Sequence, residues 1–184
     1  MMGRAMIAIA GVIGLAACGS EPAANEAAAD NSGGLRLASS AFGDGDPLPA
    51  QFTCDGDNIS PPLEFRGVPA GTRSFVVTMD DPDAANGTYR HWGAYNIPAY
   101  KPQLRAGAGL PSSGSAQQVV NSKGEQAYIG PCPPEGSGPH RYRFKLYALS
   151  KEQLEMAADE GVASLQTAAS THALGEATLI ATYE

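Results

Sequence analysis

Residues Gly130–Leu149 read GPCPPEGSGPHRYRFKLYAL, and this stretch decides the fold of the chain. Its first half has the composition of a loop, with three prolines by residue 134 and then Gly136 and Gly138. In its second half, apolar side chains alternate with Arg and Lys, the period of a strand with one buried face. His140 lies where this stiff loop meets the strand, a position that often carries binding or catalytic groups. Taken alone, the stretch favours the simpler interpretation, an ordinary proline-rich connection.

The rest of the chain predicts a mostly-β single domain. Ser74–Met79 (SFVVTM) is almost continuously apolar, which indicates a central strand buried on both faces. Ser150 and Gln153 have the spacing of a capping box, so we expect a helix over 151–158. A second helix is expected from Asp159 to residue 174. Further strands are expected at 35–39, 91–97, 118–121 and 179–183, with brief pairing at 51–54.

Composition limits the classes of partner. The chain has 184 residues, of which 43% are hydrophobic, enough for one domain with a real core. Its formal net charge is −7. A nucleic-acid partner needs a basic face, so none is expected. The same charge argues against electrostatic attachment to anionic lipid.

The N-terminus has the features of a signal peptide. Arg4 is followed by an apolar segment, Ala5–Leu15, which is too short for a stable membrane span. The sequence Leu-Ala-Ala-Cys ending at Cys18 resembles the bacterial lipoprotein box. The resemblance implies a signal peptide over residues 1–17, cleavage before Cys18 and acylation of its thiol. A plain secretory signal is the alternative.

The segment after Cys18 predicts where in the cell the protein lies and how its domain is connected to the anchor. Gly19, where an Asp would favour retention at the inner membrane, resembles the pattern of outer-membrane lipoproteins that face the periplasm of the bacterial cell envelope. Residues 18–34 are small, polar and acidic and cannot bury enough apolar surface to offset their ordering entropy. We expect a flexible acidic tether there, followed by a folded domain over residues 35–184.

Three separate pieces of the chain carry polar groups at strand ends. Asp81 and Asp83 follow the central strand, His91 and Trp92 open the next strand, and His140 opens another. The whole chain has three histidines and one tryptophan, so this placement is uneven. If these strands are neighbours in one sheet, the three joints converge on one site.

These pieces resemble the phosphatidylethanolamine-binding protein family, also called Raf kinase inhibitor-like, and its bacterial branch in particular. The resemblance rests on Asp81-Pro82-Asp83, on His91-Trp92 and on the stretch Gly130–Leu149. It covers the chain from about Leu35 to the C-terminus. Further support comes from Phe52-Thr53-Cys54-Asp55-Gly56, Ile59-Ser60-Pro61-Pro62-Leu63 and Ala177-Thr178-Leu179-Ile180-Ala181-Thr182-Tyr183.

The resemblance implies a β-sandwich with short C-terminal helices and one small anion-binding pocket. Carried over by position, the ligand-binding residues are Asp81, His91, Pro134, His140 and Tyr142, with Asp83 and Trp92 nearby. The chain departs from the family pattern at Ala85, where a proline is expected. A cis bond at Ala84–Ala85 is therefore in doubt, because a non-proline cis bond costs about 3 kcal/mol.

The residues themselves support an anion pocket. An anion needs several donors aimed at one point, and His91 and His140 can each donate. Asp81 can accept from a histidine and fix its tautomer. The proline-rich loop has few backbone N–H groups, so it mainly shapes the rim. Tyr142 and Trp92 are expected to supply an apolar wall.

Two other chemistries were weighed. The Asp and His spacings match no zinc pattern, so no metal and no cofactor are expected. Cys132 lies eight residues before His140, so a Cys–His pair is conceivable. With Cys18 acylated, however, Cys54 and Cys132 are the two remaining cysteines in an oxidising compartment. A disulfide between them would stabilise the fold by roughly 3–4 kcal/mol, and free thiols are the alternative.

The sequence thus favours a lipid-anchored periplasmic binding protein with a pocket for a small anionic or phosphorylated ligand. A second hypothesis is an interaction module that inhibits a protein kinase or protease. A third is a weak hydrolase that uses a histidine as general base. The chain lacks a clear nucleophile motif, so a binding protein is favoured over an enzyme.

Overall fold

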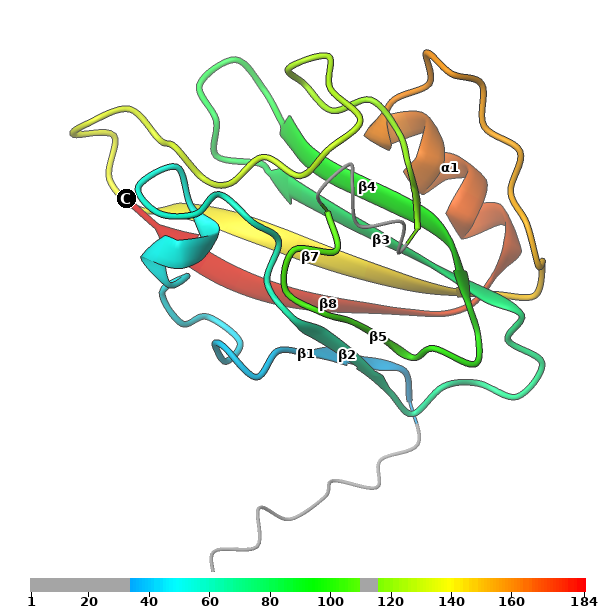
Figure 1. Ribbon diagram of the computed structural model, residues 1–184. Helices are drawn as coiled ribbons and strands as arrows, with labels where there is room; N and C mark the ends of the chain where they lie inside the picture. The colour runs from blue at the N-terminus through cyan, green and yellow to red at the C-terminus, as the bar shows by residue number, and fades with distance from the viewer. Residues whose placement is uncertain (1–33, 110–115) are drawn as a thin grey trace, which may run out of the picture. The chain divides into compact units, whose positions relative to one another are not determined.

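The computed structural model describes residues 34–109 and 116–184 (Figure 1). The predicted signal peptide, Cys18 and residues 18–33 of the tether lie outside this part. The described elements are β1 (Arg36–Ala38), a 3-10 helix η1 (Ala50–Phe52), β2 (Leu63–Arg66), β3 (Ser74–Asp81), β4 (Tyr89–Pro98), β5 (Gln103–Leu104), β6 (Gln117–Gln118), β7 (His140–Leu149), α1 (Val162–His172) and β8 (Ala173–Tyr183).

The strands form two antiparallel sheets. The small sheet has the order β1-β2-β5, and the large sheet has the order β6-β4-β3-β7-β8. β3 is the central strand of the large sheet, and all eight of its residues are buried. The prediction of a central strand from the apolar run at 74–79 is confirmed. Because β4 and β7 flank β3 directly, the strand ends that carry the polar groups are neighbours.

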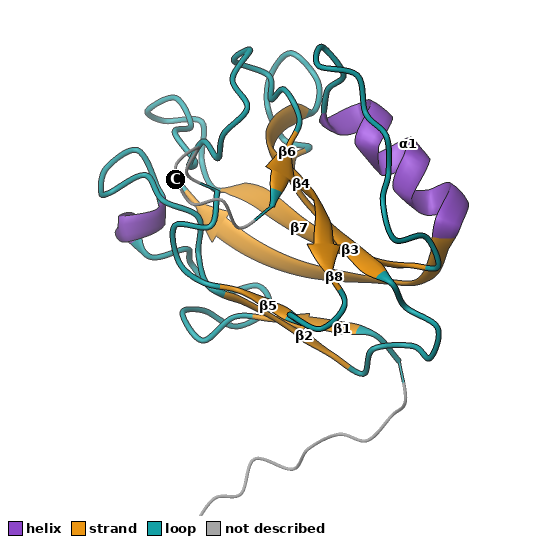
Figure 2. Cartoon of the chain, turned by 45° about the vertical axis from the view of Figure 1, so that its right-hand side comes forward, coloured by secondary structure: helices purple, strands orange, loops and turns teal. Residues whose placement is uncertain are grey.

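The domain has three layers (Figure 2). The small sheet faces one side of the large sheet, and a core led by Phe65, Phe75, Trp92 and Phe144 fills the space between them. Helix α1 covers the other side of the large sheet over a second, smaller core. The mostly-β sandwich predicted from the sequence is confirmed.

Strand β7 alternates as its sequence predicts. Tyr142, Phe144 and Leu146 belong to the core between the sheets, while the exposed Arg141 lies on the opposite side. Toward its end both faces are buried, and Tyr147 joins the core under α1. The alternation therefore ends where the helix covers the strand.

One predicted helix is absent. Residues 151–158 have no helical structure, and a single α-helix follows at Val162–His172. The side-chain amide of Asn96 replaces the expected helical bonds, because its Oδ1 accepts from Leu154 N at 2.7 Å and its Nδ2 donates to Leu154 O at 3.1 Å. The Ser150 hydroxyl, expected as a helix cap, donates to His172 O instead. The expectation of two C-terminal helices was wrong for this reason.

Two smaller differences concern short segments. The pairing expected at 51–54 is a 3-10 turn at Ala50–Phe52, and the extended segment after Asn58 continues into strand β2. Every peptide bond of the described part is trans, including Ala84–Ala85. No helix in the described residues has the length and apolar character needed to cross a membrane.

Candidate anion-binding site

Three neighbouring strands bring the predicted polar groups together. Asp81 is the last residue of β3, and His140 is the first residue of β7, the antiparallel neighbour of β3. His91 is the third residue of β4, on the other side of β3. All three side chains are buried, with exposed fractions of 3%, 6% and 4%. The sheet register thus produces the convergence that the sequence could only suggest.

A β-bulge in β4 aims His91 into this site. Met79 of β3 pairs with Trp92 and Asp80 pairs with Arg90, so His91 is an extra residue in the ladder. An extra residue lets two consecutive side chains face the same side of a sheet. Trp92 accordingly packs in the core between the sheets, while the His91 ring contacts Tyr142 edge-on with centroids 5.3 Å apart.

Asp81 orients the ring of His140. Its Oδ2 lies 2.7 Å from His140 Nδ1, and its Oδ1 accepts from the backbone N–H of Asp83 at 2.8 Å. A carboxylate accepts only, so Nδ1 carries the proton of this hydrogen bond. The second ring nitrogen of His140, Nε2, is left for another partner.

His91 is oriented by a backbone carbonyl. Its Nδ1 lies 2.8 Å from Ile129 O, and a carbonyl oxygen also accepts only. Burial lowers the pKa of His91 below its ordinary value of 6.5, because a charged ring is disfavoured there. At neutral pH, His91 is therefore uncharged, with a proton on Nδ1 and a lone pair on Nε2.

Both Nε2 atoms face open space. Neither has a hydrogen-bond partner in the described part of the chain, where every fully buried side-chain polar atom has one. The Tyr142 ring lies near both histidine rings, its hydroxyl also lacks a partner among the described residues, and burial raises its pKa, so it keeps its proton. Three polar groups are thus available to a ligand.

These groups line a cavity of about 560 Å³. Asp81, His91, Pro134, His140 and Tyr142, the five positions carried over from the family resemblance, all line it. The sequence reasoning did not assign the loop 84–88 to the site, although its Asn-Gly pair marked it as a loop between two site strands. Other lining residues are Ala84, Ala85, Asn86, Gly87, Thr88, Tyr89, Ser122, Ile129, Gly130, Cys132 and Pro133.

The proline-rich rim is fastened to the segment 52–58. Cys132 forms a disulfide with Cys54, across 78 positions of sequence. Beside it, Cys54 N donates to Pro131 O at 3.0 Å, and Gly130 N donates to Asn58 Oδ1 at 2.7 Å. The alternatives of free thiols and of a Cys132–His140 catalytic pair are therefore overturned, since the sulfur is already bonded.

Two of the predicted site residues do not line the cavity. Trp92 is fully buried in the core, where its indole N–H donates to Gln118 Oε1 at 2.8 Å. Asp83 forms an ion pair with Arg141 just outside, and this guanidinium lowers the pKa of the Asp83 carboxyl to about 2. Asp83 supports the site from outside, because its backbone N–H donates to Asp81 Oδ1.

The described residues contain no group of three or more His, Cys, Asp or Glu side chains placed to hold a metal ion. The innermost polar groups of the cavity are the two imidazoles, the Tyr142 phenol and the Asp81 carboxylate, which is already bonded twice, and the lining also includes the polar residues Asn86, Thr88, Tyr89 and Ser122. This set suits a ligand that exchanges protons and hydrogen bonds with imidazole rings.

Comparison with known proteins identifies the family of the chain. Residues 38–184 match the family described as phosphatidylethanolamine-binding protein. The chain belongs to the phosphatidylethanolamine-binding protein family. Among its relatives is a protein named as a lipoprotein, LppC of Mycobacterium tuberculosis, which is 41% identical over 150 residues, 82% of this chain and 72% of LppC.

Two solved members of the family share the fold. YbcL of Escherichia coli, titled a new member of the mammalian family, superposes with a TM-score of 0.77 at 32% identity, over 82% of this chain and 98% of YbcL. The family homologue CT736 of Chlamydia trachomatis gives 0.74 at 36% identity, over 83% of this chain and 99% of CT736. The family resemblance read from the motifs is thereby confirmed.

Proposed function

We propose that this family member is a lipid-anchored periplasmic binding protein whose cavity takes a small anionic or phosphorylated group. The observation that carries the proposal is the pair of unpartnered Nε2 atoms, from His91 and His140, on one cavity of about 560 Å³. A cavity with a few convergent polar groups is the usual form of a small-molecule site.

The two rings have different roles in this proposal. A protonated His140 ring donates from Nε2 to the anion while Asp81 accepts from Nδ1, so the positive charge lies between two negative groups. His91 is uncharged and offers a lone pair, so it binds a hydroxyl of a protonated phosphate. A fully ionised ligand requires His91 to take up a proton first.

The proposal also places the protein in the bacterial cell envelope. Residues 1–17 form the lipoprotein signal peptide, Cys18 carries the acyl chains, and residues 18–34 tether the domain 35–184 to the outer membrane, facing the periplasm. The name of the LppC relative supports the anchor. The Cys54–Cys132 disulfide supports an oxidising compartment, because such bonds persist there and are rare in the cytosol.

Titration with inorganic phosphate tests the pocket. Residues 34–184 contain three histidines, and His172 lies at the end of α1 away from the cavity, so it is an internal control. We expect the ring signals of His91 and His140 to shift with a common saturation curve in NMR spectra, while His172 stays unchanged. Unmoved His91 and His140 signals at millimolar phosphate would defeat the proposal.

A second candidate rests on the Asp81–His140 pair. A carboxylate that holds imidazole Nδ1 leaves Nε2 as a general base, the arrangement used in hydrolases. Ser122 lines the cavity, but its hydroxyl oxygen accepts from Arg90 N and is not hydrogen-bonded to either histidine, and Cys132 is in the disulfide, so a bound water would have to attack. Turnover of a phosphoester or ester panel that disappears in His140→Gln would establish this activity, and a blank panel would exclude it for those substrates.

A further inference from the structure

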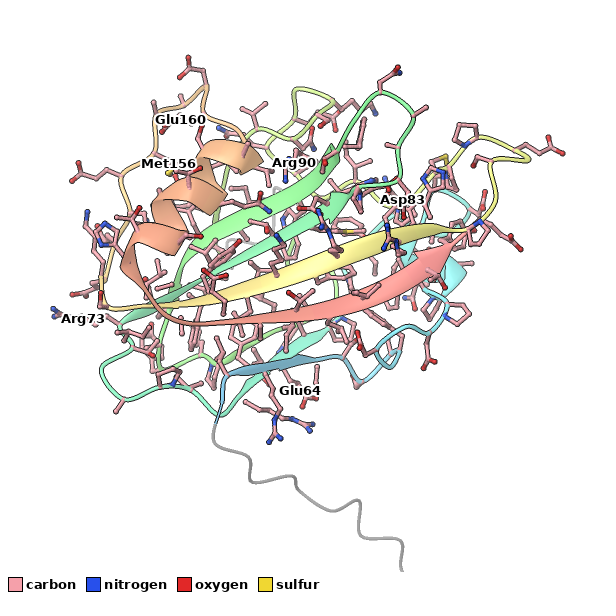
Figure 3. The ribbon with its side chains drawn as sticks, turned by 180° about the vertical axis from the view of Figure 1, so that it is seen from behind. Glu64, Arg73, Asp83, Arg90, Met156 and Glu160 are labelled. Carbon is pink, nitrogen blue, oxygen red and sulfur yellow. A yellow bond between two sulfur atoms is a disulfide. The ribbon has the colours of Figure 1, made fainter. Side chains whose placement is uncertain are left out.

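Exposed apolar and basic side chains gather at the end of the domain opposite the cavity. β3 runs from Ser74 to Asp81 and pairs antiparallel with β7, so Ser74 lies beside Leu149 at one end and the cavity lies at the other. Arg73 and Asp83 mark these two ends in Figure 3. We call the first end the basal face: residues 66–73, Tyr100, Lys101, Lys151 and Leu174.

The basal face holds the exposed large apolar side chains. In the described part of the chain, the large hydrophobic residues that are exposed are Val68 at 37%, Tyr100 at 79% and Leu174 at 44%. They come from three segments that the fold brings together. The Leu174 side chain lies beside Gly71, and Ala99, next to Tyr100, donates its N–H to Arg73 O. Gathered exposed apolar side chains indicate an interaction surface.

The basal face is also basic. Arg66 and Arg73 pair with Glu64 and Glu152, whereas Lys101 and Lys151 form no ion pair with any described residue. The Lys101 ammonium lies 5.8 Å from the ring centre of Tyr100. With Glu64 and Glu152 counted against Arg66 and Arg73, the two lysines leave this face with an excess of positive charge.

The N-terminal segment reaches the domain at this same end. β1 pairs antiparallel with β2, so Arg36 lies opposite Arg66. Gly34 is in close contact with Gly67, where an added Cβ would lie 2.2 Å from the Gly34 carbonyl oxygen. The chain therefore leaves the described domain next to the loop that carries Val68, and any anchor upstream acts from this end.

We propose that the basal face docks on an anionic lipid surface and so holds the cavity facing away from the membrane. Tyr is a preferred residue at membrane–water interfaces, and each Lys or Arg near an anionic leaflet strengthens attachment about fivefold. Surface binding grows with buried apolar area and with such attraction. Weak membrane binding by the basal face is enough if the predicted anchor keeps the local concentration of the domain at the membrane high.

Vesicle binding by residues 34–184 tests the proposal without the anchor. Residues 32–184 form one compact unit with its own core, so we expect this part to fold without the preceding segment. We expect the domain to co-sediment with vesicles of phosphatidylcholine mixed with phosphatidylglycerol, and to stay in solution with phosphatidylcholine alone. Lys101→Glu should weaken binding roughly fivefold or more. Tyr100→Ser should also weaken binding to the vesicles that contain phosphatidylglycerol.

Lys123→Glu is the matched control, because it makes the same charge change on an exposed lysine away from the basal face. It should bind vesicles far better than Lys101→Glu. Equal loss in both variants would overturn the proposal, since only net charge would then matter. Equal binding to neutral and anionic vesicles, or none to either, would overturn it as well. Unchanged phosphate titration in Lys101→Glu would separate this face from the cavity.

Orientation is tested on a nanodisc of the same lipid mixture. A hexahistidine tag before residue 34 holds the domain on nickel-chelating lipid and replaces the anchor. With a paramagnetic lipid added, we expect line broadening at Val68, Tyr100 and Leu174 and none at His91 or His140. Broadening at the histidine end would contradict the proposal. Signals of the basal face that change with protein concentration alone would assign it to a second copy instead.

Discussion

Two histidines of one cavity differ in what holds them. His140 Nδ1 is bonded to a carboxylate, and His91 Nδ1 is bonded to a backbone carbonyl. A carboxylate supports a positive ring, whereas burial without a charged partner opposes it. The same residue type is therefore held in two different ways, His140 by a carboxylate and His91, which burial keeps uncharged, by a carbonyl oxygen.

Replacing Asp81 with Asn separates these roles. The amide keeps the size of the side chain but removes the negative charge that balances a protonated His140. We expect phosphate affinity to fall about tenfold or more, because a charge-assisted hydrogen bond is lost. Isothermal titration calorimetry measures the change. Asp57→Asn, an exposed neighbour outside the cavity lining, should leave affinity unchanged, and equal affinity in Asp81→Asn would contradict the assignment.

The lowered pKa of His91 predicts a pH dependence for anion binding. The free protein holds this ring neutral, and a bound dianion favours the protonated ring, so binding takes up a proton. Affinity must then rise as pH falls from 8 through the ordinary histidine value near 6.5. Sulfate is the probe, because its own charge stays constant over this range. A sulfate affinity that does not change with pH would contradict this protonation of His91. In the His91→Gln variant, the change of affinity with pH should be smaller.

At the scale of single residues, the order of the sequence motifs predicted which residues meet at the candidate site but not how their side chains are arranged. The location of Asp81, His91 and His140 at strand ends predicted a shared site without the strand register. The bulge that turns His91 into the cavity depends on how β3 and β4 pair, which no local pattern encodes. The same bulge places Trp92 in the core between the sheets, where it does not line the cavity.

At the scale of elements, the rim depends on a covalent tie. Removing the Cys54–Cys132 bond with the Cys54→Ser/Cys132→Ser double variant should lower the free energy of unfolding by about 3–4 kcal/mol, because the unfolded chain regains a long loop. Urea denaturation measures the loss, and the wild type under reducing conditions should match the variant. Identical midpoints in oxidised and reduced wild type would contradict a structural role for the bond.

Helix α1 requires a glycine beneath it. A Cβ at Gly93 would lie 2.6 Å from Val119 Cγ2 and 3.0 Å from Leu165 Cδ2. Gly93→Ala is therefore expected to lower the free energy of unfolding by about 1–3 kcal/mol through overpacking. Gly34→Ala is the control, since a Cβ there meets nothing within 4 Å. Thermal denaturation compares the two, and an equal effect of both substitutions would contradict tight packing of helix on sheet.

Elements with a strong period were predictable, and those defined by distant partners were not. The apolar run of β3 and the alternation of β7 fix their own burial. Residues 151–158 carry a capping box, yet the amide of Asn96, more than fifty positions earlier, bonds Leu154 and prevents the helix. The two-residue strands β5 and β6 depend on their partners: the strand predicted at 118–121 is found as β6 at Gln117–Gln118, and β5 was not predicted.

At the scale of the whole domain, the cavity and the start of the described chain lie at opposite ends. The cavity lies where β3 ends and β7 begins, and the chain reaches the domain beside the far ends of those strands. Antiparallel strands of eight to ten residues hold the two ends apart. A domain built this way can present its cavity to solvent while its other end stays near the membrane.

A crystal structure of residues 34–184 soaked in phosphate tests the central claim most directly. The account predicts a phosphate between the two rings, within hydrogen-bond distance of Nε2 of both His91 and His140, with the Asp81–His140 bond kept. A cavity that stays free of phosphate at saturating concentration, or a phosphate bound elsewhere while both Nε2 atoms contact only water, would contradict it.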